Sequence, residues 1–311
     1  MLIVNNKETI TYHPIIKYLP SKIRNLLTFS KLSDAEEIRL RKGLPLVINF
    51  SEKSCFLTDV GCLTNSIKNA VIVTDSDIKE ALELIVKSSL YTAENSLKQG
   101  FVTVEGGNRI GISGSAVITD NKISSLKNIS GLNYRIAKEI CGVADNIIDN
   151  IYRNGKILNT LIISPPCCGK TTILRDMIRN LSNGFESFRG KNISLVDERS
   201  EIAAMYKGVP QNDVGIRTDV MSNLKKSTGI RMMIRSMGPQ IIATDEIGGE
   251  NDFNSVVDAV YSGVKLLLTV HGNDIDDVSK SFIDNHLFKI IDVLTKKNKP
   301  RWSEKYLYIG G

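Results

Sequence analysis

A lysine and two threonines that could bind phosphate follow a short run of small residues near the middle of the chain. The segment Ser164-Pro-Pro-Cys-Cys-Gly-Lys-Thr-Thr172 nearly matches G-x-x-x-x-G-K-[ST], with Ser164 in place of the first glycine. In such a loop, backbone N–H groups surround phosphate oxygens, Lys170 neutralises the β and γ phosphates, and the Thr171 hydroxyl ligates Mg²⁺. The pattern therefore predicts a site for ATP and Mg²⁺. The residues expected to contact the nucleotide are Ser164, Pro165, Pro166, Cys167, Cys168, Gly169, Lys170, Thr171 and Thr172.

Three apolar segments downstream end on side chains that can take part in hydrolysis. These side chains are Asp197 and Glu198, then Asp245 and Glu246, then His271. Asp245 could hold Mg²⁺ through water, Glu246 could polarise the attacking water, and His271 could sense or stabilise a γ-phosphate. Taken singly, an Asp-Glu pair after a strand is often a helix cap, and a lone histidine is more often structural. Together these groups favour hydrolysis of a nucleoside triphosphate.

Arginines near loops supply a further class of candidate. A transferring γ-phosphoryl group is stabilised by an arginine that reaches in from a neighbouring subunit. Arg231 and Arg235 are four residues apart, so a helix would place both on one face. The candidates for this role are Arg217, Arg231 and Arg235, and two further arginines that could reach a phosphate are Arg109 and Arg135. For any one of them, a salt bridge or an ordinary surface charge is the alternative interpretation.

A strand and a helix are required on either side of the phosphate loop, and the sequence predicts both. Leu158–Ile163 is apolar and strand-like, and apolar residues from Ile173 to Leu181 recur at helical spacing up to Gly184, which can cap a helix. The alternative, that Gly169-Lys-Thr-Thr is merely a helix start, is less consistent with the preceding strand. Since the carboxyl ends of parallel strands gather at one edge, we expect a mainly parallel central sheet with the site at that edge.

The N-terminal part has a different pattern. Glu37–Arg41 alternates like a strand with Arg39 and Arg41 on one face, Thr74 precedes an amphipathic helix, and Gly106-Gly107-Asn108 joins two strand-like runs as a hairpin turn. We therefore predict an α/β protein in two parts. Residues 1–145 form a smaller α+β domain, and residues 146–311 form the phosphate-loop domain.

Composition is ordinary for a globular protein. Of 311 residues, 42% are hydrophobic and 24% are charged, and the net charge of +6 is too small to indicate a nucleic-acid partner. No signal-like segment follows Met1 and no apolar run reaches the roughly 18 residues of a spanning helix, so we expect a cytoplasmic chain. The five cysteines have no metal-site spacing, and their odd number argues against a disulfide framework.

Four motifs in a fixed order resemble the secretion ATPases of type II and type IV systems. They are the phosphate loop, Val196-Asp-Glu-Arg-Ser-Glu-Ile202, Ile242-Ala-Thr-Asp-Glu-Ile-Gly248 and Thr269-Val-His-Gly272, which correspond to the Walker A, Asp box, Walker B and His box of that superfamily. Within it the chain most resembles the family of stage III sporulation protein AA. The segments that carry this closer likeness are Glu37-Ile-Arg-Leu-Arg41, Gly106-Gly-Asn-Arg-Ile-Gly111, Asp197-Glu-Arg-Ser-Glu-Ile202, Gly208–Asp219 and Ile234-Arg-Ser-Met237.

The resemblance implies a RecA-like ATPase domain in a homo-oligomeric, hexameric ring that hydrolyses ATP with Mg²⁺. It implies a position in the mother-cell cytoplasm, at the face of the membrane toward the forespore, where membrane-embedded components of a sporulation channel complex are the partners. The nucleotide would lie between the RecA-like domain of one subunit and the N-terminal domain of the next, which would bring Arg109 and Arg135 to it. In this family we expect a histidine where Asn108 stands.

Two other functions stay open from the residues alone. The first is a nucleic-acid-dependent ATPase, although no RNA-binding signature and no aromatic-rich basic stripe supports a specific nucleic-acid partner. The second is a nucleotide-gated scaffold with little hydrolysis, which the exchange of glycine for Ser164 would explain.

Overall fold

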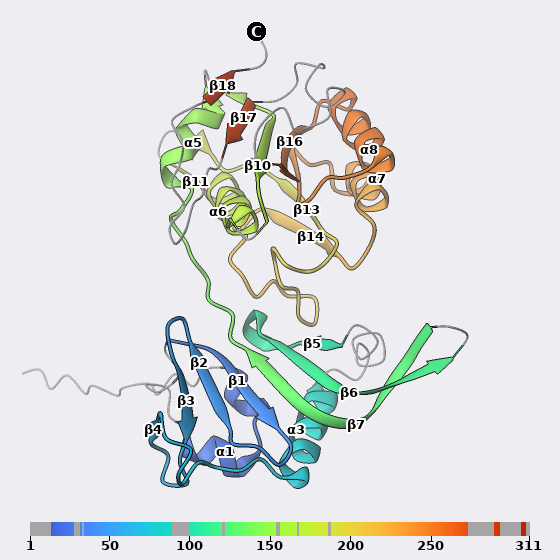
Figure 1. Cartoon of the computed structure of the whole chain (residues 1–311). Helices are drawn as coiled ribbons and strands as arrows, with labels where there is room; N and C mark the ends of the chain where they lie inside the picture. The colour runs from blue at the N-terminus through green and yellow to red at the C-terminus, as the bar shows by residue number, and fades with distance from the viewer. Residues whose placement is uncertain are drawn as a thin grey trace, which may run out of the picture. The chain divides into compact units, whose positions relative to one another are not determined.

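The chain folds into two compact units, each with its own hydrophobic core. A computed structural model describes residues 14–27, 32, 34–88, 100–119, 122–153, 156–166, 168–185, 188–272, 289–292 and 306–308. The units are Met1–Lys138 and Glu139–Gly311 (Figure 1).

The first unit contains seven strands and four short or medium helices among its described residues. The strands are β1 (Ala35–Arg41), β2 (Val47–Phe50), β3 (Ser54–Leu57), β4 (Leu63–Thr64), β5 (Phe101–Thr103), β6 (Arg109–Thr119) and β7 (Lys122–Arg135), and the helices are η1 (Pro14–Tyr18), α1 (Ser21–Leu26), α3 (Asp75–Ser88) and η2 (Glu105–Gly107). The strands form one antiparallel sheet in the order β4-β3-β2-β1-β7-β6-β5. Ile38 and Leu40 of β1 are fully buried in the core, which places Arg39 and Arg41 on the opposite face, as the alternation predicted.

Local side-chain contacts explain two features of the first unit. Thr74 and Asp77 form a reciprocal cap at the start of α3, in which Thr74 N–H donates to the Asp77 carboxylate (2.7 Å) and Asp77 N–H donates to Thr74 Oγ1 (3.2 Å). Asn108 is fully buried beside the β5–β6 turn, where its Nδ2 donates to Glu105 O (2.7 Å) and its Oδ1 accepts from Ala137 N–H (2.9 Å). An asparagine at this position therefore has a structural role in holding the hairpin.

The second unit is an α/β domain on a largely parallel sheet, and the predicted fold class is confirmed. Its helices are α5 (Asp145–Ile151), α6 (Lys170–Asn183), α7 (Lys226–Met237) and α8 (Glu250–Tyr261), and its sheet strands are β10 (Thr160–Ser164), β13 (Ile193–Asp197), β14 (Thr218–Ser222), β15 (Ile241–Thr244), β16 (Lys265–His271), β17 (Lys289–Asp292) and β18 (Tyr306–Tyr308). The strand order is β14-β13-β15-β16-β10-β17-β18, and among the described strands of this sheet only the β17–β18 pair is antiparallel. Two small ribbons complete the unit, β8 (Tyr152–Arg153) with β9 (Lys156–Ile157) and β11 (Gly184–Phe185) with β12 (Phe188–Arg189).

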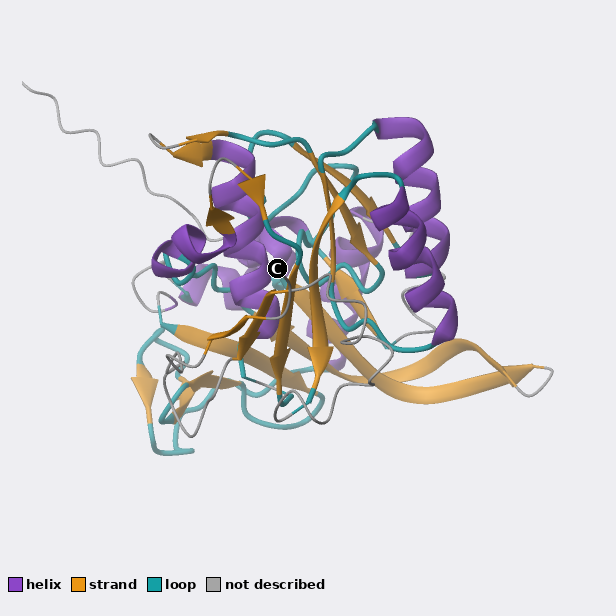
Figure 2. Ribbon diagram, turned by 90° about the horizontal axis from the view of Figure 1, so that it is seen from above, coloured by secondary structure: helices purple, strands orange, loops and turns teal. Residues whose placement is uncertain are grey.

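Helices cover both faces of this sheet, as Figure 2 shows. Ile162 of β10 packs in one core with residues of α5 and α6, whereas its neighbours Leu161 and Ile163 pack in a second core with residues of α7 and α8. This three-layer arrangement explains why β10 is buried along its whole length and reads as a continuous apolar run. No helix in the described part of the chain has the length and apolar character needed to span a membrane.

The boundary between the units lies earlier than the predicted residue 145. Residues 139–145 belong to the second unit, where Ala144 is fully buried in the core that includes α5 and α6. The Ala144 N–H donates to the buried carboxylate of Asp176 on α6 (2.7 Å). This contact attaches the segment before α5 to the phosphate-loop domain. The sequence shows no change in composition at the boundary.

Candidate functional site

The phosphate loop joins β10 to α6, as predicted. Gly169 caps the start of α6 with φ of +83°, a left-handed conformation that glycine adopts without strain. Ser164 is the fully buried last residue of β10, and its φ is not positive. The serine therefore fits because this position keeps ordinary strand backbone. Pro165, Pro166, Cys168, Thr171 and Thr172 lie in the loop or the first turn of α6, and Cys167 lies outside the described residues.

Lys170 is the first residue of α6, and its side chain points back into the loop. The residue is 6% exposed, and its Nζ donates to Ser164 O (2.7 Å), Pro165 O (2.9 Å) and His271 Nδ1 (2.9 Å). An ammonium group has three hydrogens, so these three acceptors can account for all of them. The buried charge is thus stabilised by two carbonyls and an imidazole at the carboxyl edge of the sheet.

His271 links Lys170 to Glu246. Because an ammonium group can only donate, His271 Nδ1 is the acceptor, which leaves Nε2 with the ring hydrogen. Nε2 lies 3.0 Å from Glu246 Oε1, and the second carboxylate oxygen, Oε2, lies 3.0 Å from Arg199 Nη1. The structure therefore brings together three residues predicted from separate motifs, and adds Arg199.

The backbone of Glu246 is held in an uncommon conformation. Its φ is +45°, which costs a residue with a side chain on the order of 1 kcal/mol or more and persists only where the surroundings fix it. The Glu246 N–H donates to Thr269 Oγ1 (2.8 Å) and the next N–H, of Ile247, donates to Thr269 O (2.9 Å). Thr269 on β16 therefore sets the position from which the Glu246 side chain starts.

Asp197 occupies a structural position and is not directed at the loop. It is fully buried, and its carboxylate accepts N–H groups from Glu201 (2.9 Å), Ile202 (3.1 Å) and Ala203 (2.9 Å). Burial raises the pKa of Asp197, while these hydrogen bonds act in the opposite direction. Arg175 of α6 donates to carbonyls of the same segment, at Ile202 O (2.6 Å) and Glu201 O (2.8 Å). These contacts give Asp197 a role in fixing the segment after β13, and its catalytic role stays a prediction.

Asp245 is a buried carboxylate with the chemistry of a cation ligand. It is 3% exposed and accepts no hydrogen bond from the described residues. Burial, with the negative charge of Asp197 as the next cause, raises the pKa of Asp245 to about 6. The positive charge of Lys226 acts in the opposite direction on this pKa. A buried carboxylate that accepts no hydrogen bond from the described residues and lies beside a second acid fits a divalent cation. Glu198, the other predicted acid, pairs with buried Lys226 at 2.7 Å.

Replacing Asp245 with asparagine should stabilise the protein at neutral pH in the absence of Mg²⁺ and nucleotide. The folded protein holds the Asp245 proton up to about pH 6, against an ordinary pKa of 3.8. The free energy of unfolding therefore falls as the pH rises through that window, by roughly 2–3 kcal/mol. Asparagine has no such cost, so thermal unfolding should show a higher Tm for Asp245→Asn at pH 7.5 and a smaller gain at pH 5. A gain that is equal at both values, or shared by the exposed-site control Asp219→Asn, would contradict the assignment.

The candidate arginines of the second unit differ in the groups that they contact. Arg217 Nη1 donates to Ser182 O (3.0 Å) at the C-terminal end of α6, which is the end opposite Lys170. The helix dipole stabilises a cation at this end. This contact is structural, and the finger role expected for Arg217 stays a prediction. Arg231 and Arg235 lie on exposed turns of α7, and Arg231 Nε pairs with Asp258 of α8 at 3.1 Å. Their finger role stays a prediction.

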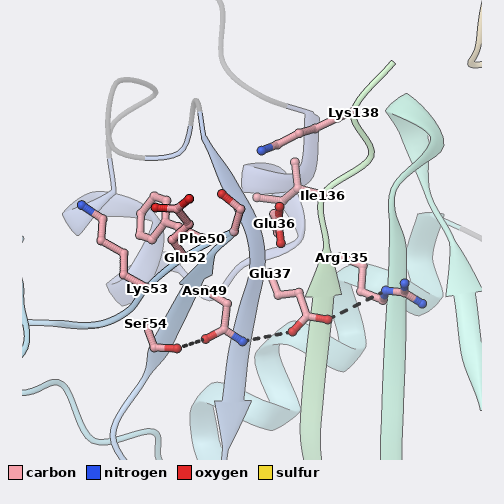
Figure 3. Close-up of a pocket in the computed structure, with 11 residues that line it drawn as sticks. Glu36, Glu37, Asn49, Phe50, Glu52, Lys53, Ser54, Arg135, Ile136 and Lys138 are labelled. Atoms are coloured by element: carbon pink, nitrogen blue, oxygen red, sulfur yellow. Dashed lines mark hydrogen bonds and ion pairs between the residues drawn. The ribbon is translucent and has the colours of Figure 1, made fainter. Parts of the chain in front are cut away.

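Arg109 and Arg135 belong to the first unit, where they are directly opposite each other on β6 and β7. The guanidinium carbon of Arg109 lies 5.1 Å from the centre of the Phe101 ring. Arg135 Nε lies 3.9 Å from Glu37 Oε1. Both residues line a polar hollow of about 690 Å³ near the end of β7 (Figure 3). Glu37 also accepts hydrogen bonds from Arg39, Asn49 and Asn133. These contacts place the Glu37 carboxylate beside the Arg135 guanidinium at the edge of the hollow.

Arg199 and Thr269 are the contacts that the sequence analysis missed. Residues two apart on a strand share a face, so Thr269 could have been identified from its spacing to His271. Arg199 lies within the Asp box, but its spacing gave it no role, because its contact with Glu246 joins the end of one strand to the end of another.

The chain matches the family model described as sporulation stage III, protein AA, over residues 10–305. It is 35% identical over 269 residues to stage III sporulation protein AA of Bacillus subtilis (strain 168), which covers 86% of this chain and 83% of the relative. A 32% identity over 181 residues relates it to the protein SEEDLING PLASTID DEVELOPMENT 1 of Arabidopsis thaliana, covering 56% of this chain and 25% of that protein.

Solved structures of an ATPase and of a pilus retraction motor share the fold. The ATPase DotB of Legionella pneumophila matches with a TM-score of 0.53 and 15% identity over 93% of this chain and 78% of that chain. The pilus retraction motor PilT with bound ADP matches with a TM-score of 0.53 and 15% identity over 86% of this chain and 77% of its own. These matches confirm the expected fold, and the family model with the Bacillus subtilis relative confirms the closer family resemblance. The chain belongs to the family of sporulation stage III protein AA.

Proposed function

We propose that this protein binds and hydrolyses ATP, and that hydrolysis drives a motor of a secretion-type complex. The single observation that carries this proposal is the contact of Lys170, His271 and Glu246 at the carboxyl edge of the parallel sheet, beside the N-terminus of α6. Helix N-termini and backbone N–H groups bind phosphate, a lysine neutralises it, and a carboxylate can accept a proton from water. The phosphate loop, the Lys170 ammonium group and the Glu246 carboxylate all lie at this edge of the sheet.

Each residue then has a distinct role. The loop residues 164–172 contact the phosphates, with Lys170 at the β and γ positions. Thr171 and Asp245 would hold Mg²⁺, which supplies charge neutralisation at the phosphates. Glu246 orients and deprotonates the attacking water, and His271 responds to the γ-phosphate. Asp197 and Arg175 keep the segment after β13 in place around the site.

An arginine from another subunit completes the site in this proposal. Arg109, Arg135, Arg231 and Arg235 carry guanidinium groups that a neighbouring subunit could present, and a γ-phosphoryl group in transfer gains strongly from such a charge. The arrangement requires a homo-oligomeric ring, for which we propose a hexamer. Hydrolysis would move the N-terminal units relative to the ATPase ring.

The biological setting proposed follows from family membership. A sporulation family and the fold of secretion ATPases support work at a membrane complex, and we propose the mother-cell cytoplasm with a membrane-embedded channel as partner. PilT, which shares the fold, is a motor whose structure contains ADP, and this supports a nucleotide here. The ordinary backbone at Ser164 supports a hydrolysing enzyme over a scaffold without hydrolysis.

Mass and phosphate release measured together as a function of protein concentration test this function. We expect the rate of ATP hydrolysis per subunit to rise as the protein assembles, because the arginine comes from a neighbour. A rate per subunit that stays constant across assembly would place the complete site within one chain. Assembled protein that binds ATP and releases no phosphate would overturn the enzymatic proposal.

A further inference from the structure

Arg199 lies just after β13. It is the last residue in a series of contacts that runs from Lys170 through His271 and Glu246. Its Nη1 lies 3.0 Å from Glu246 Oε2, while His271 Nε2 lies 3.0 Å from Glu246 Oε1. Each carboxylate oxygen therefore has its own N–H partner. One such contact would leave the carboxylate free to rotate, and two contacts fix both its position and its plane.

The Arg199–Glu246 pair is too exposed to matter much for folding. The Arg199 side chain is 62% exposed, and ion pairs with an exposed partner contribute little to stability. Orientation of the carboxylate is a different effect. A catalytic group displaced by about 1 Å can lose about 100-fold in rate. Since Thr269 fixes the Glu246 backbone, the side-chain contacts decide where the carboxylate lies.

Of the two contacts to Glu246, the one from His271 depends on Lys170. A phosphate bound by Lys170 would take the place of one of the acceptors described above. Among these three described acceptors, His271 contributes a side chain, whereas Ser164 and Pro165 contribute backbone carbonyls of the loop. When phosphate takes the lysine hydrogen from His271 Nδ1, the imidazole loses the contact that anchors it. The Arg199 contact does not involve Lys170, so it persists.

We propose that Arg199 is a positioning residue for the hydrolysis proposed above, on which this inference rests. It holds the Glu246 carboxylate toward the attacking water while Lys170 binds phosphate. In the step it supports, an O–H bond of water breaks and its proton passes to Glu246, a bond forms between the water oxygen and the γ-phosphorus, and the bond from that phosphorus to the ADP oxygen breaks.

Steady-state kinetics of Arg199 variants test the proposal. We expect Arg199→Ala to lower kcat about 10- to 100-fold with KM for ATP changed by less than about 3-fold, because Arg199 contacts the carboxylate and not the nucleotide. Arg199→Lys should recover part of kcat, since it keeps the charge. In a Glu246→Gln background, Arg199→Ala should lower the residual rate by less than about 2-fold, because its effect passes through Glu246. Arg189→Ala, at an exposed arginine of β12, is the matched control and should change neither constant.

Three results would overturn the proposal while the function stands: an unchanged kcat in Arg199→Ala, an effect on KM alone, or an undiminished loss in the Glu246→Gln background. Unchanged thermal unfolding of Arg199→Ala separates lost orientation from lost stability. Wild-type protein that assembles but releases no phosphate would overturn the proposed function, and this inference with it.

Discussion

Replacing Lys170 with alanine is expected to weaken ATP binding by at least about 100-fold, since hydrogen bonds to charged groups contribute roughly 1.5–3 kcal/mol each and Lys170 would contact two phosphates. Among the lysines that the structure describes, Lys170 is the one whose Nζ contacts Ser164 O, Pro165 O and His271 Nδ1, which it reaches from the first turn of α6. Calorimetric titration with Mg·ATP measures the affinity directly.

Lys265→Ala is the matched control for this substitution. Lys265 is exposed at the amino end of β16, the end of the strand opposite His271. Its removal should leave ATP affinity unchanged. Thermal unfolding of Lys170→Ala shows whether the loop survives the loss of a buried cation, and a folded variant with wild-type affinity would remove Lys170 from the site.

Glu246→Gln is expected to lower kcat by about 100- to 10,000-fold while ATP affinity changes only a few-fold, the loss typical of removing a general base. Glutamine keeps the shape of the side chain and one carbonyl oxygen, so the backbone contacts of Glu246 with Thr269 should persist. Single-turnover phosphate release, together with equilibrium binding of ATP, separates the chemical step from binding.

Glu250→Gln makes the same exchange at the exposed first residue of α8, four residues along the chain. It should turn over at the wild-type rate. Full turnover in Glu246→Gln would remove Glu246 from the mechanism, and a parallel loss of ATP affinity would assign it to binding and not to the chemical step.

Hydrophobic periodicity was sufficient to predict the central architecture. The apolar run at Leu158–Ile163, the helical spacing up to Gly184 and the three later apolar segments correspond to β10, α6, β13, β15 and β16. A continuous apolar run indicates burial on both faces, which is the environment of a parallel strand. The domain boundary was missed because Ala144 is attached to the second unit by a hydrogen bond to Asp176, a contact between distant residues that no local pattern encodes.

The candidate site was predicted in its residue types but not in its contacts. Parallel strands bring their carboxyl ends to one edge, so Lys170, Glu246 and His271 could be expected near one another. Whether an acid faces the loop or holds backbone depends on side-chain direction, and Asp197 holds backbone. Arg217 likewise depends on tertiary packing, because its partners are carbonyls at the end of α6.

The saturated hydrogen bonds of Lys170 have a consequence for any measured affinity. Lys170 can bind phosphate only in molecules in which one of its hydrogen bonds to these acceptors is broken. The apparent dissociation constant for ATP therefore equals the intrinsic dissociation constant divided by the fraction of such molecules. Each tenfold change in that fraction corresponds to about 1.4 kcal/mol. The side chain of His271 is 46% exposed, so a partner that contacts its imidazole would tune ATP affinity without touching the nucleotide.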